Sequence, residues 1–118
     1  NAPRANAELI LSGLGITRRF KALVIGAELA HGKPHPLPYL EGLRLLGARA
    51  ELSVAFEDSR TGIASASAAG LATIGMRTSL REAELAQAGA VLSADSYADA
   101  ALLALIDRII AGVAALAE

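Results

Sequence analysis

The chain has 118 residues, which is enough for one domain with a buried core. Its 11 basic and 12 acidic residues leave a net charge of -1, which excludes a strongly basic surface for nucleic acid. The sequence has no cysteine for disulfides or thiolate metal sites, no apolar run that could span a membrane and no apolar signal region at its start, so we expect a soluble cytoplasmic protein.

The first half of the chain is predicted to hold two helices and one strand. A helix is expected over residues 5–14, with Gly15 as a left-handed cap. One side of this helix carries Leu9, Ile10 and Leu14. The apolar, partly β-branched run at residues 22–26 predicts a buried strand. Residues 27–38 contain three prolines and predict a loop, and a second helix is expected over residues 37–46.

The second half is predicted to alternate strands with helices. Strands are expected at residues 52–56, 72–76 and 90–92. Helices are expected from a cap at Ser59 or Thr61 to Ala69, over residues 80–87 and over residues 98–116. The last helix is expected to bury a stripe of Leu102, Ile106, Ile109, Val113 and Leu116. Short apolar strands that alternate with helices predict an α/β fold, with a parallel sheet covered by helices on both faces.

Charged residues follow two of the predicted strands. Glu57 and Asp58 leave the strand at residues 52–56 directly, and carboxylates in such a place need a cation nearby. The candidates are a divalent metal, which prefers oxygen ligands, and Lys33 in the stretch Gly-Lys-Pro-His-Pro at residues 32–36. Because ligands of parallel sheets bind beyond the carboxyl ends of the strands, we expect these two stretches to form one site.

Each of these residues also has an ordinary structural interpretation. Asp58 could cap the following helix, and Glu57 could be a solvated loop charge. Lys33 could be a surface lysine, although the prolines around it restrict its loop. His31 and His35 could bind a metal or shuttle protons, but a surface position in the loop is favoured for both.

The order of these stretches resembles the haloacid dehalogenase-like (HAD) hydrolase superfamily. Within it, the sequence is most similar to subfamily IA, which includes phosphoglycolate phosphatase-like and β-phosphoglucomutase-like enzymes. Residues 1–4 resemble those that follow the family's second motif. Residues 32–36, with Pro38 and Tyr39, resemble the third motif, and residues 56–63 resemble the fourth.

The resemblance implies a three-layer, Rossmann-like core, dependence on Mg2+ and phosphoryl transfer through an aspartyl phosphate. Asp58 would be a direct Mg2+ ligand, and Glu57 a direct or water-mediated one. Lys33 would bridge the phosphoryl group and the nucleophilic aspartate, and Asn1 would offer its backbone amide to the phosphate. The expected partner is a small phosphorylated metabolite, with no nucleic acid and no membrane.

One motif of the family has no counterpart in the sequence. The family's first motif is an Asp-x-Asp stretch that carries the nucleophile, whereas the aspartates here stand singly at positions 58, 95, 99 and 107. Residues 1–118 therefore resemble the carboxyl-terminal part of the core domain, with the first motif and the cap domain absent. The sheet is expected to be incomplete on its N-terminal side, and these residues alone are expected to be inactive.

Rival functions remain open at this point. A phosphomutase of the same superfamily would use the same residues, and the absent cap would decide between the two. A dehalogenase is disfavoured, because Glu57 and Asp58 suit a metal that dehalogenation does not need. A receiver-like signalling domain is disfavoured because Lys33 precedes the acids in the sequence. A remnant α/β domain that serves only for interaction is a further alternative.

Overall fold

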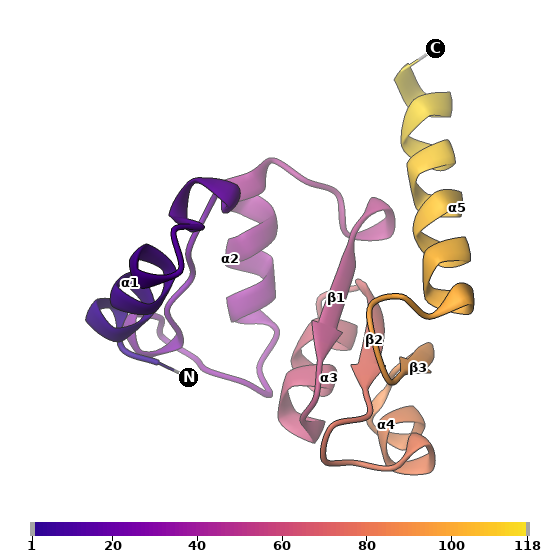
Figure 1. Ribbon diagram of the computed structural model, residues 1–118, viewed down its shortest axis with the longest axis horizontal. Helices are drawn as coiled ribbons and strands as arrows, with labels where there is room; N and C mark the ends of the chain where they lie inside the picture. Colours follow the sequence, from indigo (N-terminus) through magenta and orange to yellow (C-terminus); the bar gives the residue numbers. More distant parts are fainter. Residues whose placement is uncertain (1, 118) are drawn as a thin grey trace.

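The sheet at the centre of the fold has three parallel strands. The computed structural model describes residues 2–117. Strands β1 (Val54–Glu57), β2 (Ala72–Met76) and β3 (Leu92–Ala94) lie side by side in that order (Figure 1). β1 and β2 pair from Val54 opposite Ala72 to Glu57 opposite Gly75. The predicted α/β class with a parallel sheet is confirmed, and the sheet is small and incomplete.

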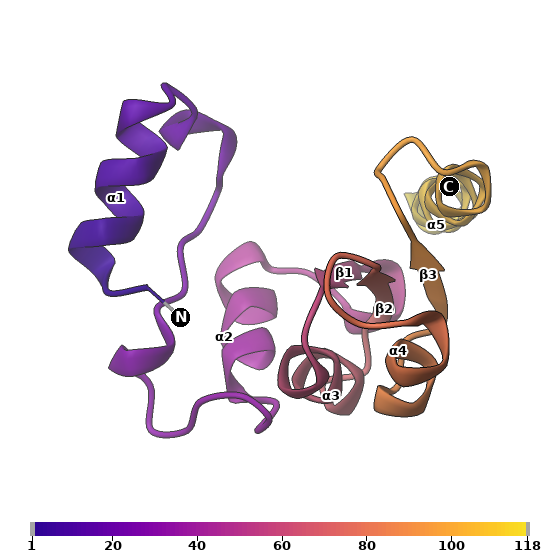
Figure 2. The ribbon, with the colours of Figure 1, turned by 60° about the horizontal axis from the view of Figure 1, so that its bottom comes forward.

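Helices cover both faces of this sheet. α3 (Arg60–Ala68) and α4 (Glu82–Ala88) lie on one face, and α5 (Ala100–Ala117) lies on the other (Figure 2). On the α4 side, a Cβ at Gly75 would be 2.9 Å from the Cβ of Leu85, so glycine permits this close approach of helix and strand. On the α5 side, the core joins the sheet to the first turns of the helix. Its buried members are Ile74, Met76, Ala94 and Leu102.

The part of the chain before Val54 has helices and short turns but no strand within the described residues. Its helices are α1 (Arg4–Gly13) and α2 (Leu37–Leu46), and its 3-10 turns are η1 (Thr17–Arg19), η2 (Gly26–Glu28) and η3 (Ala50–Leu52). α2 has the bounds that the sequence predicts, with Pro38 in its first turn. Of residues 2–53, Ile25 and Pro38 alone are buried.

The prediction of a strand at residues 22–26 is wrong. Residues 22–25 are irregular and lead into η2, although Ile25 has an extended backbone (φ -108°, ψ 115°) and is buried. A strand needs a hydrogen-bonded neighbour, and none of the three described strands runs beside this segment. A cavity of about 430 Å3 instead lies between this segment, α2 and the start of β1.

The predicted apolar faces of α1 and α5 are buried less than expected. On α1, Leu9 is 73% exposed, and Ile10 and Leu14 are also exposed. On α5, Leu102 is fully buried, whereas Val113 and Leu116 are exposed because the helix continues past the sheet (Figure 1). No helix in the described part of the chain is long and apolar enough to cross a membrane.

Two strands begin about two residues later than the sequence predicts. β1 starts at Val54, because Leu52 is part of the turn η3 and the Ser53 hydroxyl donates to the carbonyl of Arg49 at 2.6 Å. β3 covers Leu92–Ala94, the residues that pair with Ile74–Met76 of β2. The first and last residues of a strand therefore depend more on pairing with the neighbouring strand than on the bounds of the apolar run.

Candidate functional site

The Lys33 loop and the end of β1 meet at the carboxyl edge of the sheet. The ammonium of Lys33 donates to Oε1 of Glu57 and forms an ion pair with it. The Glu57 side chain is 8% exposed and that of Lys33 is 30% exposed, so the carboxylate is shielded from water and the ammonium only partly. The two stretches therefore meet as expected, through Lys33 and Glu57, and their role as one functional site stays a prediction.

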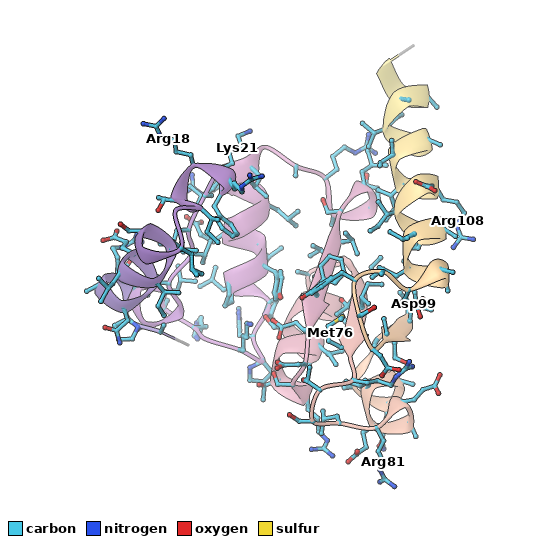
Figure 3. All side chains as sticks on the ribbon, viewed as in Figure 1. Arg18, Lys21, Met76, Arg81, Asp99 and Arg108 are labelled. Atoms are coloured by element: carbon cyan, nitrogen blue, oxygen red, sulfur yellow. The ribbon has the colours of Figure 1, made fainter. Side chains whose placement is uncertain are left out.

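The two lysines of the chain have different surroundings. Figure 3 shows Lys21 beside the end of α2, away from Met76, the last residue of β2 at the carboxyl edge of the sheet. The Lys21 ammonium donates to the carbonyl of Leu46 at 3.1 Å and so caps the carboxyl end of α2. Lys33 is therefore the one lysine that reaches the predicted site.

A tyrosine completes the surroundings of Glu57. The hydroxyl of Tyr39, in the first turn of α2, donates to the same oxygen, Oε1, at 2.5 Å. The Lys33 ammonium also lies 5.4 Å from the centre of the Tyr39 ring, within the range of a cation–π contact. Burial, and then the hydrogen bond to Glu57, raise the pKa of Tyr39 well above its ordinary value. The sequence pattern includes Tyr39 but assigns it no role.

The other oxygen of Glu57 lies against the first turn of α3. A Cβ at Gly62 would be 1.9 Å from Oε2, so any larger residue there would displace the carboxylate. The backbone amide of Gly62 donates to the Ser59 hydroxyl at 3.1 Å, and Ser59 is the N-cap of α3. Ser59, one of the two predicted caps, thus performs the capping role, which removes the structural interpretation of Asp58 as the cap.

Asp58 has an exposed and largely free carboxylate. The hydroxyl of Thr78, in the loop after β2, donates to its Oδ2 at a long 3.5 Å. Asp58 forms no ion pair with any residue from 2 to 117. The site predicted from the sequence does not include Thr78. Thr78 follows the carboxyl end of β2 as Asp58 follows that of β1, so the same rule could have predicted it.

The donor set of the site fits a hard cation bound through few protein ligands. Residues 2–117 contain no group of three or more His, Cys, Asp or Glu side chains that could enclose a metal. Mg2+ is commonly held by one or two carboxylates, with water and substrate phosphate completing its shell. The Asp58 carboxylate is free for such a role, whereas Oε1 of Glu57 is already occupied by two donors. The predicted ligand roles of both acids stay predictions, and Asn1 lies outside the described residues.

The two histidines near Lys33 occupy the surface of its loop. The rings of His31 and His35 stack with their centres 4.4 Å apart, and both residues are exposed. The Nδ1 atom of His35 accepts a hydrogen bond from the backbone amide of Leu37 at 3.0 Å, which fixes the start of α2. The surface position favoured by the sequence is confirmed for both.

A second cavity opens beside Asp58. It has a volume of about 490 Å3 and lies over the carboxyl ends of the strands. Its lining includes carboxylates, hydroxyls and apolar rings. The residues are Phe56, Glu57, Asp58, Met76, Thr78, Asp95, Ser96 and Tyr97. The volume and the polar rim suit a small polar molecule next to the free carboxylate.

The family model described as haloacid dehalogenase-like hydrolase matches residues 1–76 of this sequence. The match contains both stretches that meet at the carboxyl edge of the sheet. The chain belongs to the haloacid dehalogenase-like hydrolase family. Within that family, the similarities support subfamily IA and the carboxyl-terminal part of the core.

Relatives and solved structures agree with this assignment. A phosphoglycolate phosphatase of Rhodospirillum rubrum is 34% identical over 98 residues, which are 83% of this chain and 41% of that enzyme. A Thermotoga maritima structure classified as a β-phosphoglucomutase is 35% identical, with a TM-score of 0.72 over 79% of this chain and 44% of that one. A HAD hydrolase of family IA, variant 3, from Entamoeba histolytica is 26% identical, with a TM-score of 0.79 over 92% of this chain and 50% of that one. The chain therefore spans half or less of the length of each of these three proteins.

Proposed function

We propose that the whole protein is a Mg2+-dependent phosphatase that acts in the cytoplasm on a small phosphate monoester. The observation that carries the proposal is the Lys33–Glu57 ion pair at the carboxyl edge of the sheet, with the free carboxylate of Asp58 next to it. Membership of the HAD-like hydrolase family and the similarity to a phosphoglycolate phosphatase support phosphoryl transfer as the chemistry. The neighbouring cavity of about 490 Å3 has room for a small metabolite.

Each residue of the site has a distinct role in this proposal. Asp58 holds the metal, with Glu57 as a direct or water-mediated ligand. Lys33 neutralises the phosphoryl group, and Asn1 offers it a backbone amide. Bound Mg2+ would supply positive charge to the phosphoryl oxygens. The nucleophile is an aspartate outside these 118 residues, on which the aspartyl phosphate forms.

We further propose that residues 1–118 form the carboxyl-terminal part of the core, and that the strand with the nucleophile lies beside the free edge of β1. Two features support this placement. β1 is an edge strand within the described sheet, although it carries Glu57 of the site. The cavity of about 430 Å3 beside it is lined largely by apolar residues, including Val24, Leu43 and Val54. In the whole protein, the backbone amides of β1 should then exchange hydrogen more slowly than in residues 1–118 alone.

The activity is tested by phosphate release from phosphoglycolate, with Mg2+ or with EDTA. Lys33→Met and Asp58→Asn should each lower kcat/KM by about a hundredfold or more, because each removes a charge that acts on the phosphoryl group. Lys21→Met and Asp107→Asn are the matched controls, since these residues lie away from the site. Activity that survives EDTA, or that equals the wild type in Lys33→Met, would refute the proposal. Residues 1–118 alone should release no phosphate.

A phosphomutase is the second candidate, favoured by the 35% identity to the β-phosphoglucomutase-like structure. A mutase would move the phosphoryl group between two hydroxyls of a glucose phosphate and release little free phosphate. The ratio of isomerised product to released phosphate, measured with a phosphosugar as substrate, separates the two activities. The same two variants should abolish either one, because both begin with transfer of the phosphoryl group. A remnant domain would show neither activity and no effect of Mg2+.

A further inference from the structure

One oxygen of Glu57 accepts hydrogen bonds from two residues that precede β1 in the chain. Oε1 accepts hydrogen bonds from the Lys33 ammonium and from the Tyr39 hydroxyl. Oε2 faces the turn of α3 at Gly62 and has no side-chain donor among the described residues. A cation and a neutral hydroxyl therefore share one acceptor atom.

We propose that Tyr39 is a positioning residue that acts on Lys33 through Glu57. Its hydroxyl holds Oε1 in place and takes part of the hydrogen-bonding capacity of that oxygen. The carboxylate then binds the ammonium less tightly, which leaves Lys33 able to turn towards a phosphoryl group. The movement of Lys33 towards a phosphoryl group rests on the proposed function, whereas the contact between Tyr39 and Glu57 involves no substrate.

The geometry favours this role over simple packing. Tyr39 is only half-buried, and its ring faces the ammonium while its hydroxyl reaches the acceptor of that ammonium. When Lys33 leaves Glu57, the hydroxyl still partners a carboxylate that is 8% exposed. A buried carboxylate with no donor would be costly, so without the hydroxyl the ammonium would be held in place.

The first experiment measures how freely Lys33 reacts in the whole protein without substrate. An amine-acetylating reagent is applied for a short time, and the labelling of Lys33 relative to Lys21 is measured by mass spectrometry of peptides. In Tyr39→Phe, which keeps the ring, the ratio should fall about threefold, because the carboxylate retains a single donor and holds the ammonium more tightly. Tyr97→Phe removes a hydroxyl from an exposed tyrosine that makes no hydrogen bond to Glu57, and should leave the ratio unchanged.

A second variant decides whether Tyr39 acts through the carboxylate. Glu57→Gln removes the negative charge and should raise the Lys33 ratio. Added to Glu57→Gln, Tyr39→Phe should have no further effect. An unchanged or higher ratio in Tyr39→Phe alone would overturn the proposal, as would a full effect of Tyr39→Phe in the Glu57→Gln background. The melting temperature of each variant identifies any loss of fold, and the Glu57→Gln pair still tests the coupling if one variant is less stable.

Catalysis supplies an independent measure. In the whole protein, Tyr39→Phe should lower kcat/KM for a phosphate monoester about tenfold, whereas Lys33→Met removes activity. If Lys33→Met is inactive and Tyr39→Phe equals the wild type, the role of Tyr39 is wrong and the proposed function stands. If the wild type itself transfers no phosphoryl group, the proposed function is wrong, and the acetylation ratios still decide what Tyr39 does.

Discussion

The parts of the molecule before and after Val54 both contain helices and short apolar runs, but they differ in how they pack. After Val54, three strands and three helices enclose fully buried side chains such as Ile63, Ile74 and Leu85. Before Val54, two helices and three short turns bury Ile25 and Pro38 alone among residues 2–53. The apolar run at residues 22–26 and the strand β2 show the contrast most directly, because only β2 has a strand on each side.

The difference shows that a strand is a property of a pair of segments. An extended backbone such as that of Ile25 becomes a strand when another segment accepts and donates its hydrogen bonds. The ion pair between Lys33 and Glu57 also joins the loosely packed part before Val54 to the well-packed part after it. Variants can test both statements, beginning with the largest expected effect.

The stability of the molecule should depend mainly on the part after Val54. Leu102→Ala, at a fully buried position of α5, should lower the free energy of unfolding by about 2–5 kcal/mol. Leu9→Ala in α1, where the leucine is 73% exposed, should change it by about 0.5 kcal/mol or less. Urea titration of both variants measures these values. Equal costs would show that the part before Val54 is as well packed as the rest.

Helical glycines in the two parts should respond in opposite directions. Gly62→Ala places a Cβ 1.9 Å from Oε2 of Glu57 and should cost about 1–3 kcal/mol, because the carboxylate must leave Lys33 and Tyr39. Gly42→Ala in α2 meets only a methyl group of Val24 at 3.9 Å and should stabilise the helix by up to about 1 kcal/mol. Thermal unfolding measures both shifts. A neutral Gly62→Ala would contradict the tight contact between Glu57 and α3.

The hydrogen bond that links the two parts should be visible in the titration of Tyr39. Burial and Glu57 raise the pKa of its hydroxyl, so the folded chain binds this proton more tightly than the unfolded chain. The resulting stabilisation is complete below about pH 10, the ordinary value for tyrosine, and is lost as the pH rises through the higher folded value. Tyrosinate absorbance of Tyr97→Phe isolates Tyr39, because the chain has two tyrosines and no tryptophan. A midpoint near pH 10 in the folded protein would contradict the bond.

The smallest effect is expected for the exposed ion pair that ties α1 to η2. The Arg4 guanidinium donates to both oxygens of Glu28 at 2.8 Å and lowers the pKa of that carboxyl, chiefly through these hydrogen bonds. The contribution is present above the ordinary pKa of glutamate and is lost as the pH falls through the lower folded value. Salt should weaken it, because both groups are exposed. Arg4→Gln should change stability less than Gly62→Ala does, and nuclear magnetic resonance of the Glu28 carboxyl should report the change in pKa.

Local signals in the sequence predict the elements whose ends are set by their own residues. α2 follows from Pro38 in its first turn and Gly47 after its end, and Gly47 has the positive φ of 61° that this cap requires. β2 follows from its apolar run with the bounds observed. The failure at residues 22–26 has a non-local cause, because no apolar pattern reports whether a partner strand is beside the segment.

The site divides in the same way. The meeting of Lys33 with the end of β1 is predicted correctly from the rule that loops after parallel strands share one edge, although the segment before the Lys33 loop is not the strand that this rule assumes. The hydroxyl of Tyr39 on Glu57 and the contact of Glu57 with Gly62 are not predictable from spacing. Both depend on how α2 and α3 are oriented against the strand, which is decided by packing across the whole fold.

The free edge of β1 has a practical consequence for work with residues 1–118. No strand among residues 2–117 pairs with this edge, which lies next to an apolar cavity, and such an edge can pair with the same edge of another molecule. Dilute solutions should therefore remain clear for longer than concentrated ones. A short, soluble peptide of strand-forming sequence, added in excess, should delay the onset of turbidity by capping that edge.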